Sequence, residues 1–325
     1  MTNLKGQALI GDIGGTNARL SLCNLEDGSI STPIIYSATD NPSLESVILK
    51  FRKDCGQDFS TGCIAIASPI SGDFIKMTNN PWAFSIRELK ENTHLEKLMV
   101  VNDFTAMSMS VTSLDDSSKV KIGGGDPDPN YPIAVYGAGT GLGVAHLIHV
   151  GTRWISLPGE GGHVDMAPAN ISEDMILMSL RARIGHVSAE RVLSGPGLVN
   201  LYEAIAIRNE RVRHGLQPAD ITQGALSIPF DPDCLEALNT FCKLMGRFGG
   251  NLALTMSTFG GVYIAGGVIP HFIDFFKNSK FREAFEDKGR FKSFMQKIPV
   301  YVITDKLAGL RGAGAVIRQE MGAVL

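Results

Sequence analysis

The stretch Gly11-Asp12-Ile13-Gly14-Gly15-Thr16-Asn17 follows the apolar run 8–10 and precedes the strand-like run 19–22. A glycine-rich loop between a strand and a helix would indicate a dinucleotide fold or a Walker loop. Here the loop lies between two strands, so we predict that it is the tip of a β-hairpin. Because glycine carries no side chain, its backbone N–H groups can approach phosphate oxygens and form an anion-binding nest.

The stretch Gly137-Ala138-Gly139-Thr140-Gly141-Leu142-Gly143 repeats this pattern between the apolar runs 133–136 and 144–147. The chain therefore carries two glycine-rich hairpin tips, one in each half. Two such tips can approach a polyphosphate from opposite sides. The pair predicts a protein that transfers phosphoryl groups.

Bulk composition excludes several classes of function. The 325 residues allow two moderate domains, and the 44% hydrophobic and 19% charged residues are ordinary for a globular protein. A net charge of −3 without a basic stripe argues against binding to nucleic acid or to an anionic membrane. The apolar stretch 260–269 is too short to cross a bilayer, which takes about 20 residues. Residues 1–7 show no apolar signal-peptide core, and the five scattered cysteines indicate reduced thiols, so we predict a soluble cytoplasmic protein.

The order of predicted elements indicates an α/β protein with a substantially parallel sheet. Strands are expected at 33–36, 62–67, 98–101, 262–265 and 300–303, and helices at 43–51, 85–91, 172–185, 189–213 with a break at 195–197, 232–258 and 310–322. The polar, glycine- and proline-rich stretch 115–130 is the best candidate for a domain boundary. A long surface loop within one domain is the alternative.

Asp12 lies inside the first glycine turn. A carboxylate that faces a phosphate nest would be repelled unless a cation lay between them. Asp12 therefore suits Mg²⁺ bound through water, because Mg²⁺ keeps much of its hydration shell. The alternative is an Asp-containing turn without a ligand.

Asn102 and Asp103 end a predicted strand and precede the helix-like run 104–109. Open α/β sheets bind ligands at the carboxyl ends of their strands. A carboxylate there can accept the proton of a substrate hydroxyl that attacks phosphorus, which is general-base chemistry. A helix N-cap is an equally good interpretation of Asp103, because aspartate is favoured at that position.

The run Leu157-Pro158-Gly159-Glu160-Gly161-Gly162-His163 places an acid and an imidazole in a flexible turn, as sites that bind vicinal sugar hydroxyls require. A zinc site is disfavoured because no cysteine cluster follows. An ordinary surface loop stays open. Glu190 lies near a predicted helix start, where Ser188 would be the cap and Glu190 a first-turn acid stabilised by the helix dipole.

The turn Gly266-Gly267 follows a buried-looking strand and permits close approach of a flat ligand such as adenine, or equally a tight packing contact. Trp82 is more consistent with the core than with a substrate loop. We assign no chemical role to a further set of histidines without supporting neighbours: His94, His149, His214 and His271.

Taken in order, these segments resemble the bacterial glucokinase family, within the superfamily of sugar kinases, heat-shock chaperones and actin. The resemblance runs from Gly11 to the last helix. The stretches 11–19 and 136–145 resemble the two phosphate motifs of the family, and 264–268 resembles its adenosine motif. The stretches 101–106 and 157–163 resemble its sugar-site segments. Five motifs in the right order are far more specific than any one of them.

The resemblance implies an actin-like, ribonuclease H-like ATPase fold of two α/β domains with a cleft between them. The smaller domain would comprise 1–112 plus 304–325, and the larger 113–303. Asp103 would be the base that activates the 6-hydroxyl of D-glucose. The remaining sugar hydroxyls would be held by Asn102, Glu160, His163 and Glu190. The phosphates of ATP would be bound by Gly11, Asp12, Ile13, Gly14, Gly15 and Thr16, with Gly139, Thr140 and Gly141, and the adenosine by Gly266 and Gly267.

The same resemblance predicts Mg²⁺-ATP-dependent phosphorylation of glucose and no structural zinc after His163, because the cysteine motif of the related repressor and kinase branch is absent. A sugar-responsive repressor is disfavoured because the phosphate motif begins at Gly11. A kinase for mannose, fructose or N-acetylmannosamine, an ATP-switched binding protein and an inactive glucose sensor remain as rival hypotheses. The helical second half makes a homodimer plausible.

Overall fold

The computed structural model describes residues 5–211 and 214–325. Their contacts divide the chain into two compact units. The first comprises Met1–Ser118, Leu147–Pro158 and Asp305–Leu325, and the second comprises Lys119–His146 and Gly159–Thr304. The chain thus leaves the first unit within the polar stretch 115–130. Each unit has a hydrophobic core of its own.

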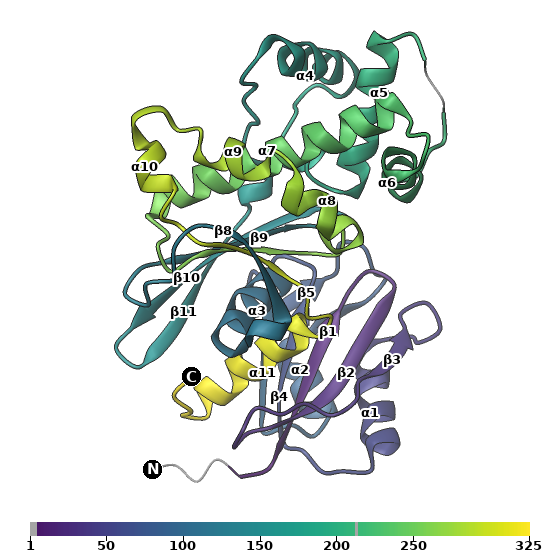
Figure 1. The fold of residues 1–325 in the computed structure, drawn as a ribbon. Coiled ribbons are helices and arrows are strands. Elements are labelled where there is room, and N and C mark those ends of the chain that lie inside the picture. Colours follow the sequence, from purple (N-terminus) through teal and green to yellow (C-terminus); the bar gives the residue numbers. More distant parts are fainter. Residues whose placement is uncertain (1–4, 212–213) are drawn as a thin grey trace. The chain divides into compact units, whose positions relative to one another are not determined.

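The first unit is built on a five-stranded sheet in the order β3-β2-β1-β4-β7 (Figure 1). Its strands are β1 Gln7–Ile13, β2 Asn17–Asn24, β3 Ile34–Ser37, β4 Thr61–Ile66 and β7 Lys97–Asn102. The β1–β2 and β2–β3 pairs are antiparallel, whereas β1–β4 and β4–β7 are parallel. The sheet is therefore mixed. The carboxyl ends of its parallel strands β1 and β7 lead into the first glycine turn and into Asp103, respectively.

Helices pack against this sheet. They are α1 Leu44–Cys55, α2 Ile86–Asn92, α3 Asp103–Ser110 and α11 Ala308–Glu320, with 3₁₀ turns at Val111–Ser113 and Asp116–Ser118 and a small ribbon of β5 Phe74–Lys76 and β6 Ala83–Ser85. α3 and α11 lie side by side because Gly312 packs directly on the Ala106 carbonyl, where a Cβ atom has no room (Figure 1). Trp82 is buried in the core, as predicted, and its Nε1 donates to the Asn41 carbonyl at 3.0 Å.

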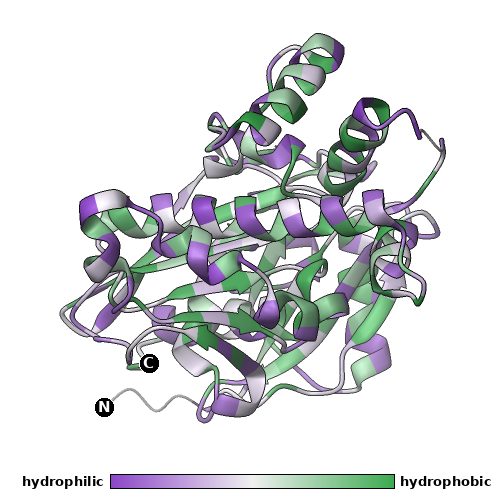
Figure 2. Ribbon diagram, turned by 45° about the horizontal axis from the view of Figure 1, so that its top comes forward, coloured by the Kyte–Doolittle hydropathy of each residue, from purple (hydrophilic) through white to green (hydrophobic). Residues whose placement is uncertain are grey.

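The second unit contains most of a six-stranded sheet in the order β11-β10-β9-β12-β13-β8. Its strands are β8 Lys119–Gly123, β9 Ile133–Ala138, β10 Leu142–Val150, β11 Arg153–Gly159, β12 Val262–Ala265 and β13 Val300–Ile303. β9, β12 and β13 are parallel, and β8 closes one edge antiparallel to β13. Apolar residues concentrate in the strands (Figure 2).

The helices of the second unit are α4 Ile171–Ile184, α5 Gly195–Arg208, α6 Pro218–Leu226, α7 Pro232–Met256, α8 Ile273–Asn278, α9 Phe281–Glu286 and α10 Lys292–Met295. Short 3₁₀ turns occur at Gly161–His163, Ala189–Arg191, Ile269–Phe272 and Gly289–Phe291. The long helix α7 contacts β9, where the buried Tyr136 hydroxyl donates to the Met245 carbonyl at 2.9 Å. Gly249 makes room for that hydroxyl.

The prediction of one helix over 189–213 with a break at 195–197 is confirmed over 198–208 and wrong for the part before it and for the break itself. Residues 189–191 form a single 3₁₀ turn, and α5 begins at Gly195. The Ser194 side chain accepts from the Gly197 N–H at 3.0 Å, and proline is well tolerated in a first helical turn. The glycine–proline motif therefore starts the helix, and residues 212–213 of the predicted range lie outside the described part of the chain.

Candidate active site

The first glycine turn joins β1 to β2 as the predicted antiparallel hairpin. Gly14, Gly15 and Thr16 form its tip, where the Gly14 N–H donates to the Asn17 carbonyl at 2.9 Å. Gly15 faces the Asn79 carbonyl, which would lie 2.8 Å from a Cβ atom. Gly11 and Ile13 are buried within β1, and the space of a Gly11 side chain is filled by the neighbouring strands. At the tip, Gly14 and Gly15 are therefore half-buried, and Thr16 is exposed.

Asp12 is held on the same hairpin. Its carboxylate lies 3.3 Å from the Arg19 guanidinium, because Asp12 and Arg19 are directly opposite in the β1–β2 register. Burial raises the pKa of Asp12, and the positive charge of Arg19 opposes that rise. Gly309, at the start of α11, approaches the carboxylate so closely that a Cβ atom there would lie 3.2 Å from it. Arg19 was not among the predicted site residues. The antiparallel register of a short hairpin would have predicted its position opposite Asp12.

Asn102 and Asp103 occupy the carboxyl end of β7 and the first position of α3, respectively. Asn102 is the N-cap: its Oδ1 accepts from the Phe104 N–H at 2.9 Å, and its Nδ2 donates to the Ser68 carbonyl at 3.4 Å. Asp103 Oδ1 accepts from the same N–H at 2.9 Å. The cap that the sequence allowed for Asp103 thus belongs to Asn102.

The Asp103 carboxyl titrates closer to neutral pH than an ordinary aspartate does. Burial, and then the negative charge of Asp12, raise its pKa to about 6, while hydrogen bonds from Phe104 act in the opposite direction. A general base works best when its pKa lies near the working pH. The environment of Asp103 therefore fits proton transfer better than a purely structural role.

The second glycine turn, residues 139–141, joins β9 to the neighbouring strand β10. The Gly139 N–H donates to the Gly141 carbonyl, and the Gly195 N–H donates to the Gly139 carbonyl, each at 2.8 Å. Gly266 adopts the left-handed φ of 89° and packs on the Ala138 carbonyl with no room for a Cβ atom. The structure therefore brings the second turn and the Gly266-Gly267 turn together.

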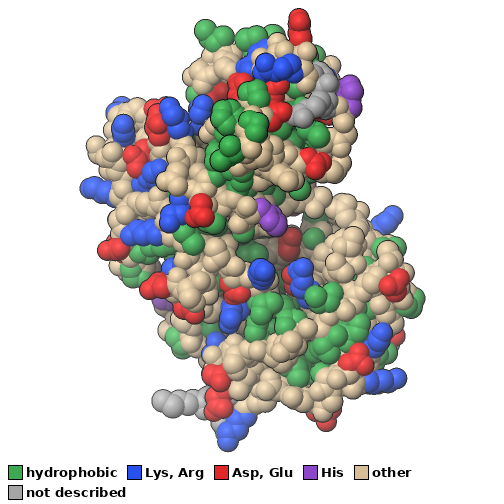
Figure 3. Space-filling view, turned by 45° about the vertical axis from the view of Figure 1, so that its right-hand side comes forward, with side chains coloured by type: hydrophobic (Ala, Val, Ile, Leu, Met, Phe, Trp, Pro, Cys, Tyr) green, Lys and Arg blue, Asp and Glu red, His purple; other side chains and the backbone are tan. Residues whose placement is uncertain are grey.

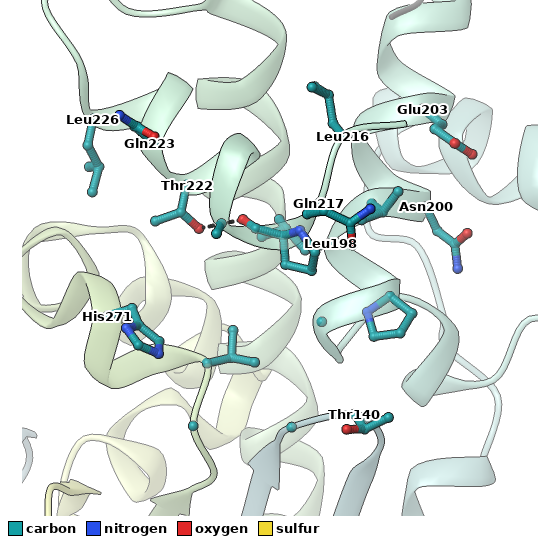
Figure 4. Close-up of a pocket in the computed structure, with 18 of the residues that line it drawn as sticks. Thr140, Leu198, Asn200, Glu203, Leu216, Gln217, Thr222, Gln223, Leu226 and His271 are labelled. Carbon is teal, nitrogen blue, oxygen red and sulfur yellow. Dashed lines mark hydrogen bonds between the residues drawn. The ribbon is translucent and has the colours of Figure 1, made fainter. Parts of the chain in front are cut away.

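A cavity of about 1280 Å³ adjoins these turns within the second unit. Its wall includes Gly139, Thr140, Gly195, Gly267, Val268 and His271. Figure 4 shows Thr140 at one end and Leu216 at the opposite end, with His271 to one side. A pocket with a glycine turn at one end and a mixed apolar and polar wall suits a nucleotide. His271, to which the sequence analysis assigned no role, lines this cavity because the chain turns back after Gly267. No local sequence pattern indicates that placement.

Glu160 is the N-cap and His163 the last residue of the 3₁₀ turn Gly161–His163, in which Gly162 packs directly on the Leu142 carbonyl. Glu190 approaches the same residue: its Oε2 accepts from the Leu142 N–H at 2.8 Å. The interpretation of Glu190 as a first-turn acid holds only for a single 3₁₀ turn, Ala189–Arg191, in which Ser188 occupies the N-cap position but makes no side-chain cap bond. Glu190 faces the second glycine turn.

The structure thus brings the predicted residues into two groups, one per unit. Asp12, Asp103 and the first turn belong to the first unit. The second unit contains the second turn, Gly266-Gly267, Glu160, His163 and Glu190. Within residues 5–211 and 214–325 no group of three or more His, Cys, Asp and Glu side chains is arranged to hold a metal ion. Over the face in Figure 3, Lys and Arg side chains are interspersed with Asp and Glu.

Comparison with known proteins decides the family. Residues 9–320 match the family model described as Glucokinase. The chain is 58% identical to a glucokinase of Cronobacter sakazakii over 318 residues, covering 98% of this chain and 99% of that protein. A glucokinase of Tolumonas auensis is 56% identical and covers 97% of this chain and 98% of that protein.

The chain belongs to the glucokinase family. The crystal structure of a glucokinase from an Antarctic psychrotroph has the same fold, with a TM-score of 0.89 at 33% identity over 96% of this chain and 99% of that one. The predictions of a two-domain α/β sugar-kinase fold and of an ATP-dependent hexose phosphotransferase are confirmed.

As a glucokinase, the enzyme transfers the γ-phosphoryl group of ATP to the 6-hydroxyl of D-glucose, the first step of glycolysis. The predicted alternatives of another hexose kinase or an inactive sensor are less consistent with this family assignment. In the part of the chain that the structure describes, no helix is long and apolar enough to span a bilayer.

Proposed function

We propose that Asp103 is the general base of this glucokinase and that the predicted residues around it form the glucose and ATP sites. The observation that carries the proposal is the Asp103 carboxyl itself, at the end of a parallel strand, partly buried, with its pKa raised to about 6. In its ionised form Asp103 takes the proton of the glucose 6-hydroxyl as that oxygen attacks the γ-phosphorus. The bond from phosphorus to the bridging oxygen breaks, and ADP leaves with the electron pair.

The other residues bind and orient the substrates. Glucose hydroxyls other than the 6-hydroxyl are held by Asn102, Glu160, His163 and Glu190. The two glycine turns, residues 11–16 and 139–141, hold the phosphates of ATP, and Gly266-Gly267 with the adjoining cavity receives the adenosine. Because phosphoryl transfer has a loose transition state, most of the rate enhancement comes from this positioning and from charge stabilisation.

A single carboxylate, that of Asp12, is the candidate to hold Mg²⁺, and it lies 3.3 Å from the Arg19 guanidinium. Mg²⁺ is usually held by one or two carboxylates, several waters and substrate phosphates. Asp12 and Asp103 repel each other electrostatically, and a divalent cation beside Asp12 relieves that repulsion. When bound, Mg²⁺ supplies positive charge that offsets the charge on the phosphate oxygens. Asp12 would hold it through water, together with the phosphates.

The assignment is tested by separating binding from turnover. We expect Asp103→Asn to bind glucose within about threefold of the wild type by calorimetry while losing about 100-fold or more of kcat. His163→Asn should instead mainly raise the KM for glucose. Asp58→Asn, an exposed change in the same unit, serves as the control. Full turnover in Asp103→Asn would remove Asp103 as base, and an unchanged KM in His163→Asn would remove His163 from the sugar site.

The domain division, the location and the subunit number are part of the same proposal. We place the small domain at 1–112 plus 304–325 and the large domain at 113–303, in a cytoplasmic enzyme. The compact units differ from this division in that residues 113–118 and Leu147–Pro158 belong to the first unit. A homodimer is supported by the exposed apolar side chains of Ile171, Met175 and Met178, which recur at helical spacing along α4. Sedimentation analysis of the wild type and of Met178→Lys tests it, since a monomer in both would exclude the dimer.

A further inference from the structure

Three segments of the second unit meet at the backbone of Leu142. This residue begins β10 directly after the second glycine turn. Its N–H donates to Glu190 Oε2 at 2.8 Å, and its carbonyl is covered by Gly162 from the turn that contains Glu160 and His163. The proposed sugar-binding segments are thus in direct contact with the end of the proposed phosphate turn.

The Glu190 segment is braced on both sides. The Ala189 N–H donates to the Val164 carbonyl at 2.8 Å, next to the turn at 161–163. The Glu190 carbonyl accepts from the Ser194 hydroxyl at 2.8 Å, and the following Gly195 N–H donates to the Gly139 carbonyl at 2.8 Å. Segment 189–195 therefore holds both ends of the glycine turn, one at Gly139 and one at Leu142.

The glycine at position 141 serves this contact. A Cβ atom at Gly141 would lie 2.5 Å from Glu190 Oε2, so any side chain would displace the carboxylate from the Leu142 N–H. Gly141 is not among the glycines with a positive φ, so its backbone alone does not demand glycine. By contrast, Gly139 has nothing within 4 Å of the position of its Cβ atom.

We propose that Glu190 is a positioning residue for the second phosphate turn, through which bound glucose tightens the binding of ATP. The inference rests on the proposed role of Glu190 as a glucose ligand. Among residues 5–211 and 214–325, the Oε1 atom of Glu190 makes no hydrogen bond, and the residue is half-buried, so Oε1 retains an acceptor for a sugar hydroxyl. A hydroxyl that donates to Oε1 restricts the rotation of the carboxylate, which fixes Leu142 and the turn before it. The entropic cost of ordering the turn is then paid only once for the two ligands. Glucose and ATP therefore bind with positive coupling.

The test is the coupling factor between glucose and a non-hydrolysable ATP analogue with Mg²⁺, measured by calorimetry on the full chain. This factor is the Kd of glucose alone divided by its Kd in the presence of saturating analogue. We expect about 5-fold or more in the wild type. Gly141→Ala should reduce it to about 1. Because the added methyl group displaces the Glu190 carboxylate, we expect the Kd of glucose alone to rise in this variant as well, and the coupling factor, as a ratio of two Kd values, corrects for that rise.

Gly139→Ala is the matched control, since it adds the same methyl group to the same turn where nothing lies close. It should retain the wild-type coupling factor even where the analogue binds more weakly. Glu190→Asp provides a second way to break the contact, because its shorter side chain cannot reach Leu142 and the sugar together. Its coupling factor should also fall to about 1, so the inference stays testable where Gly141→Ala does not fold.

The outcomes distinguish a failure of this inference from a failure of the proposed role of Glu190 as a glucose ligand. A wild-type coupling factor near 1, or wild-type coupling retained in Gly141→Ala or Glu190→Asp, would overturn the inference and leave the glucose site intact. Glu190→Gln addresses the sugar role itself, and we expect it to weaken glucose binding in the absence of nucleotide about tenfold or more. An unchanged Kd for glucose in that variant would overturn the proposed sugar role of Glu190 and the inference with it.

Discussion

Replacing Asp103 by asparagine should stabilise the folded protein at neutral pH while it lowers kcat by about 100-fold or more. The pKa of Asp103 is raised to about 6 in the folded state, against about 3.9 for aspartate in an unfolded chain. Because the folded-state pKa is the higher one, ionising the carboxyl costs folding free energy as the pH rises from about 4 to above 6. Two pKa units correspond to at most about 3 kcal/mol, and to about 1–2 kcal/mol for a partly exposed group. Asparagine keeps an Oδ1 acceptor for the Phe104 N–H.

The assay is thermal unfolding of the ligand-free wild type and Asp103→Asn at pH 8 and at pH 4, followed by circular dichroism. We predict that the Tm of the variant is about 2–3 °C higher at pH 8. The gain should be small at pH 4, where the carboxyl is protonated in the folded state and about half protonated in the unfolded chain. Asp126→Asn, an almost fully exposed carboxyl, should show no such difference. An equal or lower Tm of Asp103→Asn at pH 8, or the same gain at both pH values, would refute the reasoning.

Three further predictions follow from other contacts. The kcat/KM of the wild type for glucose should rise with pH through an apparent pKa of about 6, because the base must be ionised, and a flat profile between pH 5 and 8 would argue against Asp103. Gly309→Ala adds a methyl group 3.2 Å from the Asp12 carboxyl, so the Mg²⁺ concentration needed for half-maximal activity should rise several-fold. An unchanged concentration would indicate that Asp12 does not hold the metal. Arg247→Met removes the ion-pair partner of the Glu173 carboxylate, whose side chain is only 6% exposed. The free energy of unfolding measured in urea should therefore fall by about 3–5 kcal/mol, and adding Glu173→Gln should restore part of that loss.

The glycine turns were predictable because their signals are local. Apolar runs on either side of Gly11–Asn17 specify a hairpin, and the antiparallel register of β1 and β2 follows from so short a turn. The strand end at Asn102 and the helix after it are equally local, since an N-cap residue precedes the helical run. These features place the two candidate phosphate turns and Asp103 without any knowledge of tertiary contacts.

The sequence-based predictions were wrong where the structure depends on contacts between distant residues or on the position of a motif within its element. Gly195-Pro196-Gly197 disfavours a helix interior but suits a first turn, so the motif starts α5 once Ser194 caps it. Strand β8, Lys119–Gly123, was missed because it lies in a polar stretch and is an edge strand whose partner is almost 180 residues further along the chain. The place of Glu190 depends on Leu142, a contact between residues 48 positions apart that no local pattern specifies.

The central claim is that Asp103 removes the proton of the glucose 6-hydroxyl. The most direct test is the initial rate of glucose 6-phosphate formation from glucose and Mg²⁺-ATP at pH 8, compared between the wild type and Asp103→Asn at saturating substrates. The account predicts robust wild-type turnover and a loss of about 100- to 10,000-fold in the variant. A variant rate within a few-fold of the wild type would contradict it.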